Sequence, residues 1–252
     1  MSGYISRVLS IANVKGINKP NEDFSLCDDE RGFYALVDGV SRDKIGGIYP
    51  NPSPSADVSK IFVDSIYEYY KNHDLEVHDI NNLLLDMVRY GNEQIQHYNQ
   101  KKKWENDFLP GTVGIVGIIK YNTLFYAYIG DCYGIIVNQQ KELFTRCQTK
   151  EIAKHKGEFD SKTIRNYICN NKKHPFSYGV LNGDPSALDF LECGYRKLCE
   201  GEKILLSTDG FYDAISQIPA VKLCNMSLDQ IKEYSTDSDD KTLIIIEEDK
   251  NA

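Results

Sequence analysis

The sequence predicts an α+β sandwich, and three observations support this fold class. Short apolar runs rich in Val, Ile, Tyr and Phe recur along the chain, and Gly, Asn or Asp stand at their ends, as is typical of strands. Two adjacent stretches keep their apolar residues on one helical face. Strands and helices are grouped instead of alternating regularly, which disfavours a doubly wound parallel sheet.

The apolar runs define the predicted strands. In chain order they are Tyr4–Ala12, Phe33–Val37, Val113–Ile119, Leu124–Ile129, Gly134–Val137, Ala187–Leu191, Lys203–Ser207 and Leu243–Ile246. Between two of these runs, the residues Lys-Tyr-Asn-Thr at 120–123 predict a hairpin turn.

Spacing identifies the two long helices. The first places Val58, Phe62, Ile66 and Tyr69 on one face, and the second does the same with Leu84, Val88, Gly91, Ile95 and Tyr98. The Pro-Ser-Pro-Ser stretch at 52–55 is a start signal for the first helix. Shorter helices are expected at Lys150–His155, Ser161–Asn170 and Ser227–Glu233.

Composition restricts the class of protein. The chain has 252 residues, of which 41% are hydrophobic and 26% charged, so it can close a core without disulfides. A net charge of −8 argues against a general nucleic-acid or anionic-membrane binder. The seven cysteines are odd in number and form no CxxC pair, no signal-peptide pattern opens the chain, and the histidines lack zinc-site spacing. These features predict a reduced, cytoplasmic protein.

Acidic residues stand where strands end. Asp38-Gly39, Asp131 and Asp209-Gly210 each follow an apolar run, and the acidic clusters at 21–23 and 237–240 each precede one. An Asp-Gly pair after a strand has a plain interpretation as a turn. Several carboxylates brought together would instead repel one another unless a cation such as Mg²⁺ or Mn²⁺ neutralised them. The pattern alone leaves both interpretations open.

Taken in order, these segments resemble motifs of the metal-dependent Ser/Thr phosphatases of the protein phosphatase 2C family, most closely its bacterial branch. The matching stretches are Asn-Glu-Asp at 21–23, Ala-Leu-Val-Asp-Gly at 35–39, Gly-Thr at 111–112 with Gly-Asp at 130–131, Gly-Val-Leu-Asn-Gly-Asp at 179–184, Ser-Thr-Asp-Gly at 207–210 and Asp-Asp-Lys-Thr at 239–242. Each motif is weak alone, but the six occur in order over most of the chain.

The resemblance implies a fold and a cofactor. It implies a single domain over residues 1–252, built as a four-layer α-β-β-α sandwich of two antiparallel sheets flanked by helix pairs, with a metal centre at one end. A flap subdomain is implied at about 148–180. The implied cofactors are two Mn²⁺ or Mg²⁺ ions, with a third, weaker ion in bacterial members.

The resemblance also assigns roles residue by residue. Asp38 would bridge the two metals, Asp209 and Asp239 would hold one, Glu22 and the carbonyl of Gly39 would support the other, and Asp131 would match the ligand of the third. Asp38 and Asp209 are thereby the implied catalytic residues. The implied reaction is hydrolysis of phosphoserine or phosphothreonine by a metal-bridging water, without a phosphoenzyme, in a phosphoprotein partner.

The chain departs from the family pattern at the phosphate-binding position. Asn18 stands where the family commonly has an arginine, and Lys19 beside it is the candidate substitute for gripping the substrate phosphate. Val40 replaces a residue that is often His or Met, and an insertion-like loop follows at 41–54. Residues 150–174 carry a local excess of basic residues, interpreted either as a surface that attracts a phosphorylated partner or as a solvated helical face.

Three functions therefore remain in view. A metal-dependent protein phosphatase is favoured because the metal carboxylates are all present. A catalytically silent binding module is favoured by Asn18 and Val40, and a phosphatase of a small phosphorylated metabolite remains a third possibility. We expect a monomer that binds neither nucleic acid nor membrane.

Overall fold

The computed structural model describes residues 3–13, 20–40, 50–73, 79–102, 104, 109–234 and 239–249. They form two five-stranded sheets in which every neighbouring pair of strands is antiparallel. The first sheet has the order β1 (Tyr4–Ile11), β10 (Lys241–Glu248), β9 (Lys203–Ser207), β6 (Tyr133–Val137) and β7 (Lys141–Leu143). The second has the order β2 (Phe24–Asp28), β3 (Phe33–Val40), β4 (Gly111–Lys120), β5 (Thr123–Ile129) and β8 (Glu192–Lys197).

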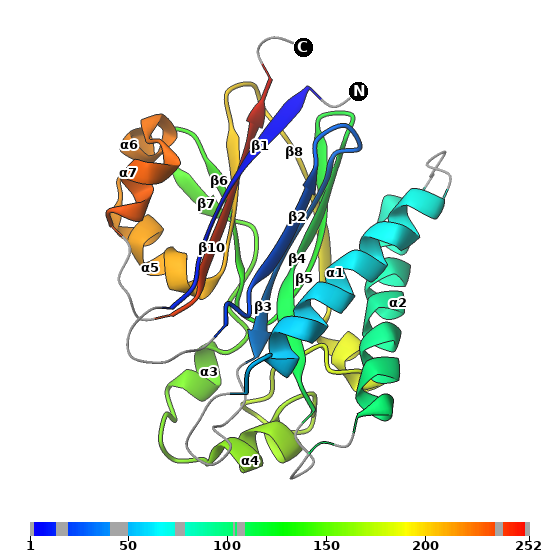
Figure 1. The fold of residues 1–252 in the computed structure, drawn as a ribbon. Coiled ribbons are helices and arrows are strands. Elements are labelled where there is room, and N and C mark those ends of the chain that lie inside the picture. The colour runs from blue at the N-terminus through cyan, green and yellow to red at the C-terminus, as the bar shows by residue number, and fades with distance from the viewer. Residues whose placement is uncertain are drawn as a thin grey trace.

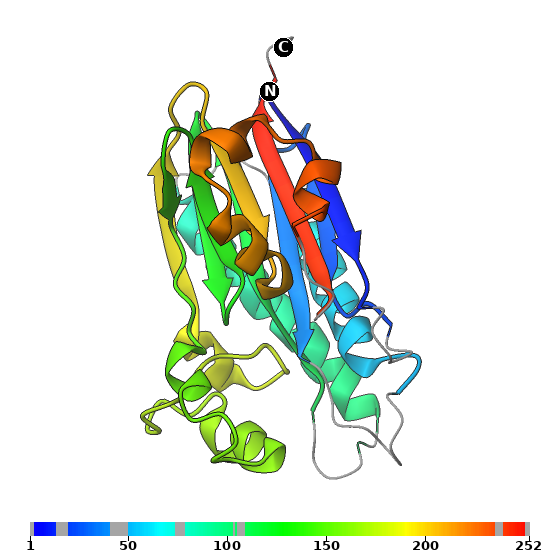
Figure 2. The same cartoon turned by 90° about the vertical axis from the view of Figure 1, so that its left-hand side faces the viewer.

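Helices cover the outer face of each sheet, which confirms the predicted four-layer α-β-β-α sandwich. The long helices α1 (Pro54–Asn72) and α2 (Ile80–Lys101) lie side by side over the second sheet (Figure 1). Over the first sheet lie α5 (Asp209–Gln217), α6 (Ala220–Asn225) and α7 (Leu228–Lys232) (Figure 2). The expected helix pair on this side is therefore three short helices.

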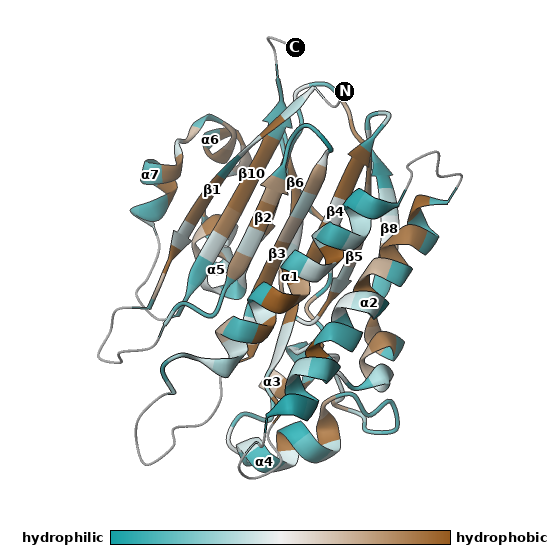
Figure 3. Ribbon diagram, turned by 45° about the vertical axis from the view of Figure 1, so that its right-hand side comes forward, coloured by the Kyte–Doolittle hydropathy of each residue, from teal (hydrophilic) through white to brown (hydrophobic). Residues whose placement is uncertain are grey.

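Side-chain alternation along the strands divides the core into layers. On β3, Phe33, Ala35 and Val37 pack in the cluster that includes α1 and α2, whereas Tyr34 and Leu36 pack between the two sheets. Strands buried on both faces read as nearly continuous apolar runs. Brown, apolar segments accordingly run along β4 and β10 (Figure 3).

The hairpin turn has the backbone that its sequence predicts. Tyr121 and Asn122 have φ values of 51° and 54°, and Lys120 pairs with Thr123. Two successive residues with positive φ define a type I′ turn, whose twist matches that of the flanking strands.

One predicted strand is wrong. Residues 187–191 do not form a strand, because a 3-10 helix runs from Pro185 to Phe190 and β8 starts only at Glu192. The Asp184 side chain accepts a hydrogen bond from the Ser186 amide, and Pro185 occupies the start of the helix, so local capping decides the conformation here.

The segment 148–180 lies at the end of the sandwich where β3 ends (Figure 1). It contains α3 (Lys150–Ala153), α4 (Ser161–Thr163) and a π-helical turn at Ile164–Ile168. That this segment acts as a separate flap stays a prediction. Of the helices that the structure describes, none has the length and apolar character that crossing a bilayer requires.

Candidate metal centre

Asp38 occupies the end of the layer between the two sheets. It follows Tyr34 and Leu36 at spacings of two along β3, so it shares their face. Burial raises the pKa of the Asp38 carboxyl well above its usual range, and four more carboxylates add to the rise by repulsion: Asp23, Asp209, Asp131 and Asp239. The structure thus brings four of the predicted site residues together, namely Asp38, Asp131, Asp209 and Asp239.

Asp131 is held by the loop that follows β6 and β7. Gly130, with a φ of 88°, turns the chain at the end of β5, and the Thr149 hydroxyl donates a hydrogen bond to Asp131 Oδ2 at 3.0 Å. Burial is the main cause that raises the pKa of Asp131, and the charge of Asp239 contributes.

Asp209 is the first residue of α5. The partial positive charge of a helix N-terminus favours a carboxylate there. Burial nevertheless raises the pKa of Asp209 to about 7, and the charges of Asp131 and Asp239 add to the rise. Asp209 is exposed at the surface, and it lies close enough to Asp131 and Asp239 for their charges to act on it.

Glu22 lies beside Gly39, the residue that follows Asp38. It is only 2% exposed, its carboxylate accepts a hydrogen bond from the Ser53 hydroxyl at the start of α1, and its carbonyl accepts one from the Gly39 amide at 3.1 Å. A Cβ at Gly39 would lie 2.8 Å from the Glu22 carbonyl oxygen, so only glycine allows this approach. Glu22 and Gly39 are thus neighbours, as the resemblance implies.

Asp239 and Asp240 have different surroundings. Asp239 is exposed, whereas Asp240 is 2% exposed and its carboxylate accepts hydrogen bonds from the amides of Asn13 at 2.7 Å and Glu22 at 3.1 Å. Asp240 therefore fastens the segment of residues 20–23 to the start of β10. A Cβ at Gly210 would lie 2.2 Å from the Asp240 carbonyl oxygen, so α5 can begin against this segment only with glycine at that position.

Asp23 and Asp240 are the residues that the sequence-based assignment missed. Asp23 is 7% exposed, its Oδ2 accepts a hydrogen bond from the Thr208 hydroxyl at 3.1 Å, and it heads the charges that act on Asp38. Asp23 and Asp240 each stand next to an assigned residue. The spacing of residues in the sequence does not show which of two adjacent acids faces the centre and which holds neighbouring segments in place. The predicted phosphate-binding residues Asn18 and Lys19, and most of the loop at 41–54, lie outside the described residues.

The donor set fits divalent cations in its chemistry. All its members are carboxylate or carbonyl oxygens, the ligands that Mg²⁺ and Mn²⁺ prefer, and their mutual repulsion is what a cation would relieve. Within the described residues, however, no three His, Cys, Asp or Glu side chains are arranged as a group that could hold an ion. Mg²⁺ usually keeps several waters and takes one or two carboxylates, so the arrangement fits hydrated ions better than a closed protein cage.

Comparison with known proteins gives a clear result at the level of structure only. No family model matches the chain, and no curated protein matches its sequence. Among solved structures, the Mycobacterium tuberculosis serine/threonine phosphatase PstP/Ppp superposes with a TM-score of 0.68 at 18% identity, covering 97% of this chain and 98% of that one. The S. agalactiae serine/threonine phosphatase gives 0.68 at 16% identity, covering 97% and 99%.

Further neighbours have the same character. The PPM Ser-Thr phosphatase MsPP from Mycobacterium smegmatis gives a TM-score of 0.62 at 14% identity, covering 96% of this chain and 97% of that one. The catalytic domain of PstP has been solved in complex with two manganese ions, with a TM-score of 0.67 and 18% identity, covering 97% of each chain. Coverage of nearly the whole length on both sides, together with the sheet order and the helical layers, confirms the resemblance in its structural sense: this chain has the fold of the bacterial protein phosphatase 2C-type Ser/Thr phosphatases.

Proposed function

We propose that the protein is a metal-dependent phosphatase that hydrolyses phosphoserine and phosphothreonine in protein substrates. The observation that supports this most strongly is the convergence of Asp38, Asp131, Asp209 and Asp239 at one end of a sandwich that has the phosphatase fold. These acids come from segments far apart in the sequence, and their mutual repulsion opposes folding. A binding partner with positive charge accounts for their presence together.

The proposed roles of the chain's residues follow from their positions. Asp38, at the end of β3, would help to hold both of two Mn²⁺ or Mg²⁺ ions, while Asp209 and Asp239 would hold one and Glu22 with the Gly39 carbonyl the other. Asp131 would hold a third. Bound divalent ions supply a water nucleophile of lowered pKa and positive charge opposite the phosphoryl oxygens.

Supporting contacts hold several of these acids in place. The Ser53 hydroxyl orients Glu22, the Thr149 hydroxyl orients Asp131, and Asp240 ties the strands together through backbone amides. Such preorganisation means that the carboxylates need little rearrangement when a ligand arrives. No protein nucleophile takes part, since the attacking oxygen comes from water.

The test is hydrolysis of p-nitrophenyl phosphate and of a phosphothreonine peptide with and without Mn²⁺. We expect metal-dependent activity that falls at least about a hundredfold in Asp38→Asn and in Asp209→Asn, the scale on which loss of preorganised charge acts. Asp64→Asn is the matched control, because Asp64 lies on α1 with its side chain about half exposed and, among the described residues, pairs with Lys60. Full activity in the presence of a chelator would show that the metal chemistry is wrong.

One observation favours a second function, a catalytically silent binding module with the same fold. It is the absence, among the described residues, of three acidic or other ligating side chains arranged as a group that could hold an ion. The same assay separates the two functions: a wild-type protein that hydrolyses neither substrate with Mn²⁺ or Mg²⁺ would support the silent module. Mn²⁺ binding measured by calorimetry then tells whether the carboxylates still hold a metal.

A further inference from the structure

An open groove of about 970 Å³ lies next to the proposed metal centre. One side is formed by Tyr133 and Tyr212, whose rings stack at 3.5 Å with 3° between their planes. Tyr133 starts β6, two residues after Asp131, and Tyr212 lies on α5, three residues after Asp209. The stacked pair therefore adjoins two of the proposed metal ligands.

Hydrogen bonds connect one lining residue of the groove to the proposed metal centre. Cys147 lines the groove, and its Sγ lies 3.2 Å from the Thr149 hydroxyl, which in turn donates to Asp131 Oδ2 at 3.0 Å. Phe190 and Leu191 also line the groove and supply apolar surface. A chain segment lying in the groove would therefore run directly up to the acidic cluster.

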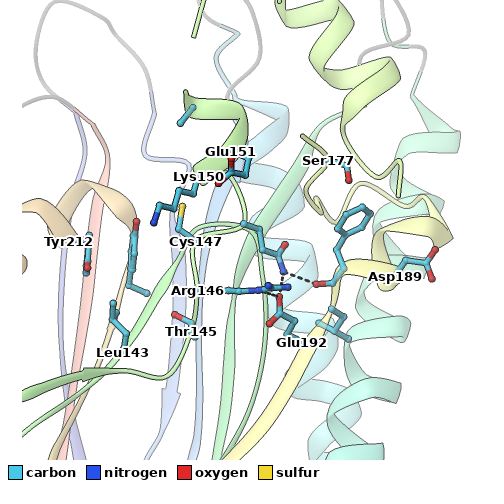
Figure 4. Close-up of a pocket in the computed structure, with 15 residues that line it drawn as sticks. Leu143, Thr145, Arg146, Cys147, Lys150, Glu151, Ser177, Asp189, Glu192 and Tyr212 are labelled. Atoms are coloured by element: carbon cyan, nitrogen blue, oxygen red, sulfur yellow. Dashed lines mark hydrogen bonds and ion pairs between the residues drawn. The ribbon is translucent and has the colours of Figure 1, made fainter. Parts of the chain in front are cut away.

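Three acids and two bases line the groove, and one of the bases is left over once the ion pairs with neighbouring residues are counted. Each acid that lines it already pairs with a base: Glu151 with Lys154 at 2.7 Å, Glu192 with Arg146 at 2.8 Å and Asp189 with Lys172 at 3.2 Å. Lys150 also lines the groove, and its ammonium group has no ion pair or hydrogen bond with a described residue, although its charge acts on Glu151. Its side chain extends past Cys147 toward the side that Tyr212 occupies (Figure 4).

We propose that this groove binds the polypeptide that flanks the phosphorylated residue of the substrate, and that Lys150 pairs there with an acidic side chain of that polypeptide. The proposal rests on the phosphatase function proposed above. The groove's volume is that of sites that enclose drug-sized ligands, so it can take several residues of an extended chain. The stacked tyrosines offer amphipathic surface, and Lys150 selects for negative charge.

The experiment compares two phosphothreonine peptides that differ only in their flanks, one with Glu at the second to fifth positions on both sides and one with Gln at all of them. We expect wild-type protein to favour the Glu peptide by about twofold to fivefold in kcat/KM, mainly through KM, the range that one exposed ion pair gives. Lys150→Glu should abolish or invert the preference, whereas Lys150→Arg should keep it. Lys156→Glu is the matched control, since Lys156 is a neighbouring exposed lysine that does not line the groove.

The outcomes separate this proposal from the one it rests on. Equal turnover of both peptides by an enzyme that hydrolyses p-nitrophenyl phosphate would overturn the groove assignment alone. A shift in Lys156→Glu as large as that in Lys150→Glu would also overturn it, because the effect would then be one of general surface charge. Failure on all three substrates would overturn the phosphatase function itself.

Discussion

Lys141 stabilises the end of the helix that carries Asp209. From β7 its ammonium group donates hydrogen bonds to the carbonyl oxygens of Ile215 at 2.9 Å, Ser216 at 2.7 Å and Ile218 at 2.8 Å. The last carbonyls of a helix have no partner within it, and a cation there also opposes the helix dipole. One side chain thus replaces the hydrogen bonds that α5 lacks at its C-terminal end.

The size of this contribution follows from the geometry. A hydrogen bond to a charged group contributes about 1.5–3 kcal/mol, but the three bonds share one ammonium and are not additive. Ser216 is exposed, so its carbonyl can bind water after the change, and burial lowers the pKa of Lys141, which shows that desolvation offsets part of the gain. We therefore expect Lys141→Met to lower the free energy of unfolding by about 2 kcal/mol, less than the sum of the separate bonds.

Urea denaturation of the metal-free protein at pH 7 measures this change. The methionine keeps the apolar stem and removes only the charged end, so lost packing is a minor factor. Lys154→Met is the control, because Lys154 forms only an exposed pair with Glu151 and should contribute less than about 1 kcal/mol. If Lys141→Met stays within about 0.5 kcal/mol of the wild type, or matches the control, the capping argument is wrong.

Three other changes test separate parts of the structure. Asp38→Asn should raise the melting temperature of the metal-free protein, because it relieves repulsion between carboxylates, and it should reduce the rise in melting temperature that Mn²⁺ causes. Thermal unfolding with and without Mn²⁺ measures the two effects. A rise with Mn²⁺ as large as that of the wild type would contradict the metal assignment. Gly130→Ala should lower the free energy of unfolding in urea by about 2–4 kcal/mol, because its Cβ would lie 2.4 Å from a valine side chain of β4; Gly157→Ala, with a similar φ of 90° and no atom within 4 Å, should lose only about 1 kcal/mol. Tyr121→Asn combined with Asn122→Gly should stabilise the type I′ turn by about 0.5–1 kcal/mol, and an unchanged urea midpoint would show that the turn is already optimal.

The sequence predicted the fold better than it predicted local detail, for a physical reason. Strands buried on both faces leave long apolar runs, so Lys203–Ser207 is found at its predicted bounds. The run at 187–191 is equally apolar, but Asp184 and Pro185 before it start a helical turn, and local capping outweighs strand propensity. The helix at Asp209–Gln217 was missed because its first residues were read only as part of a motif.

The site shows the same division. Motif order led to Asp38, Asp131, Asp209 and Asp239, which the structure gathers at one end of the sandwich. The sequence assigns no role to Asp23, which follows Glu22 in the same motif, because the turn that positions two adjacent acids decides which of them faces the centre. The groove beside Tyr212 could not be foreseen at all, since its lining comes from segments that only the folded chain brings together.

The order of the first sheet has a consequence for how the protein is made. Among the strands that the structure describes, β1 pairs only with β10, and β10 also pairs with β9. While the chain is being synthesised, the place of β10 between β1 and β9 therefore stays empty until residues 241–248 have left the ribosome. Until then the first sheet is incomplete. The hydrogen bonds from the amides of Asn13 and Glu22 to Asp240 cannot form either, so the segment that carries Glu22 is not yet held in place. The completed fold is thus expected to form only after release of its last strand, which makes its assembly slow and exposes β1 to wrong pairing in the interval.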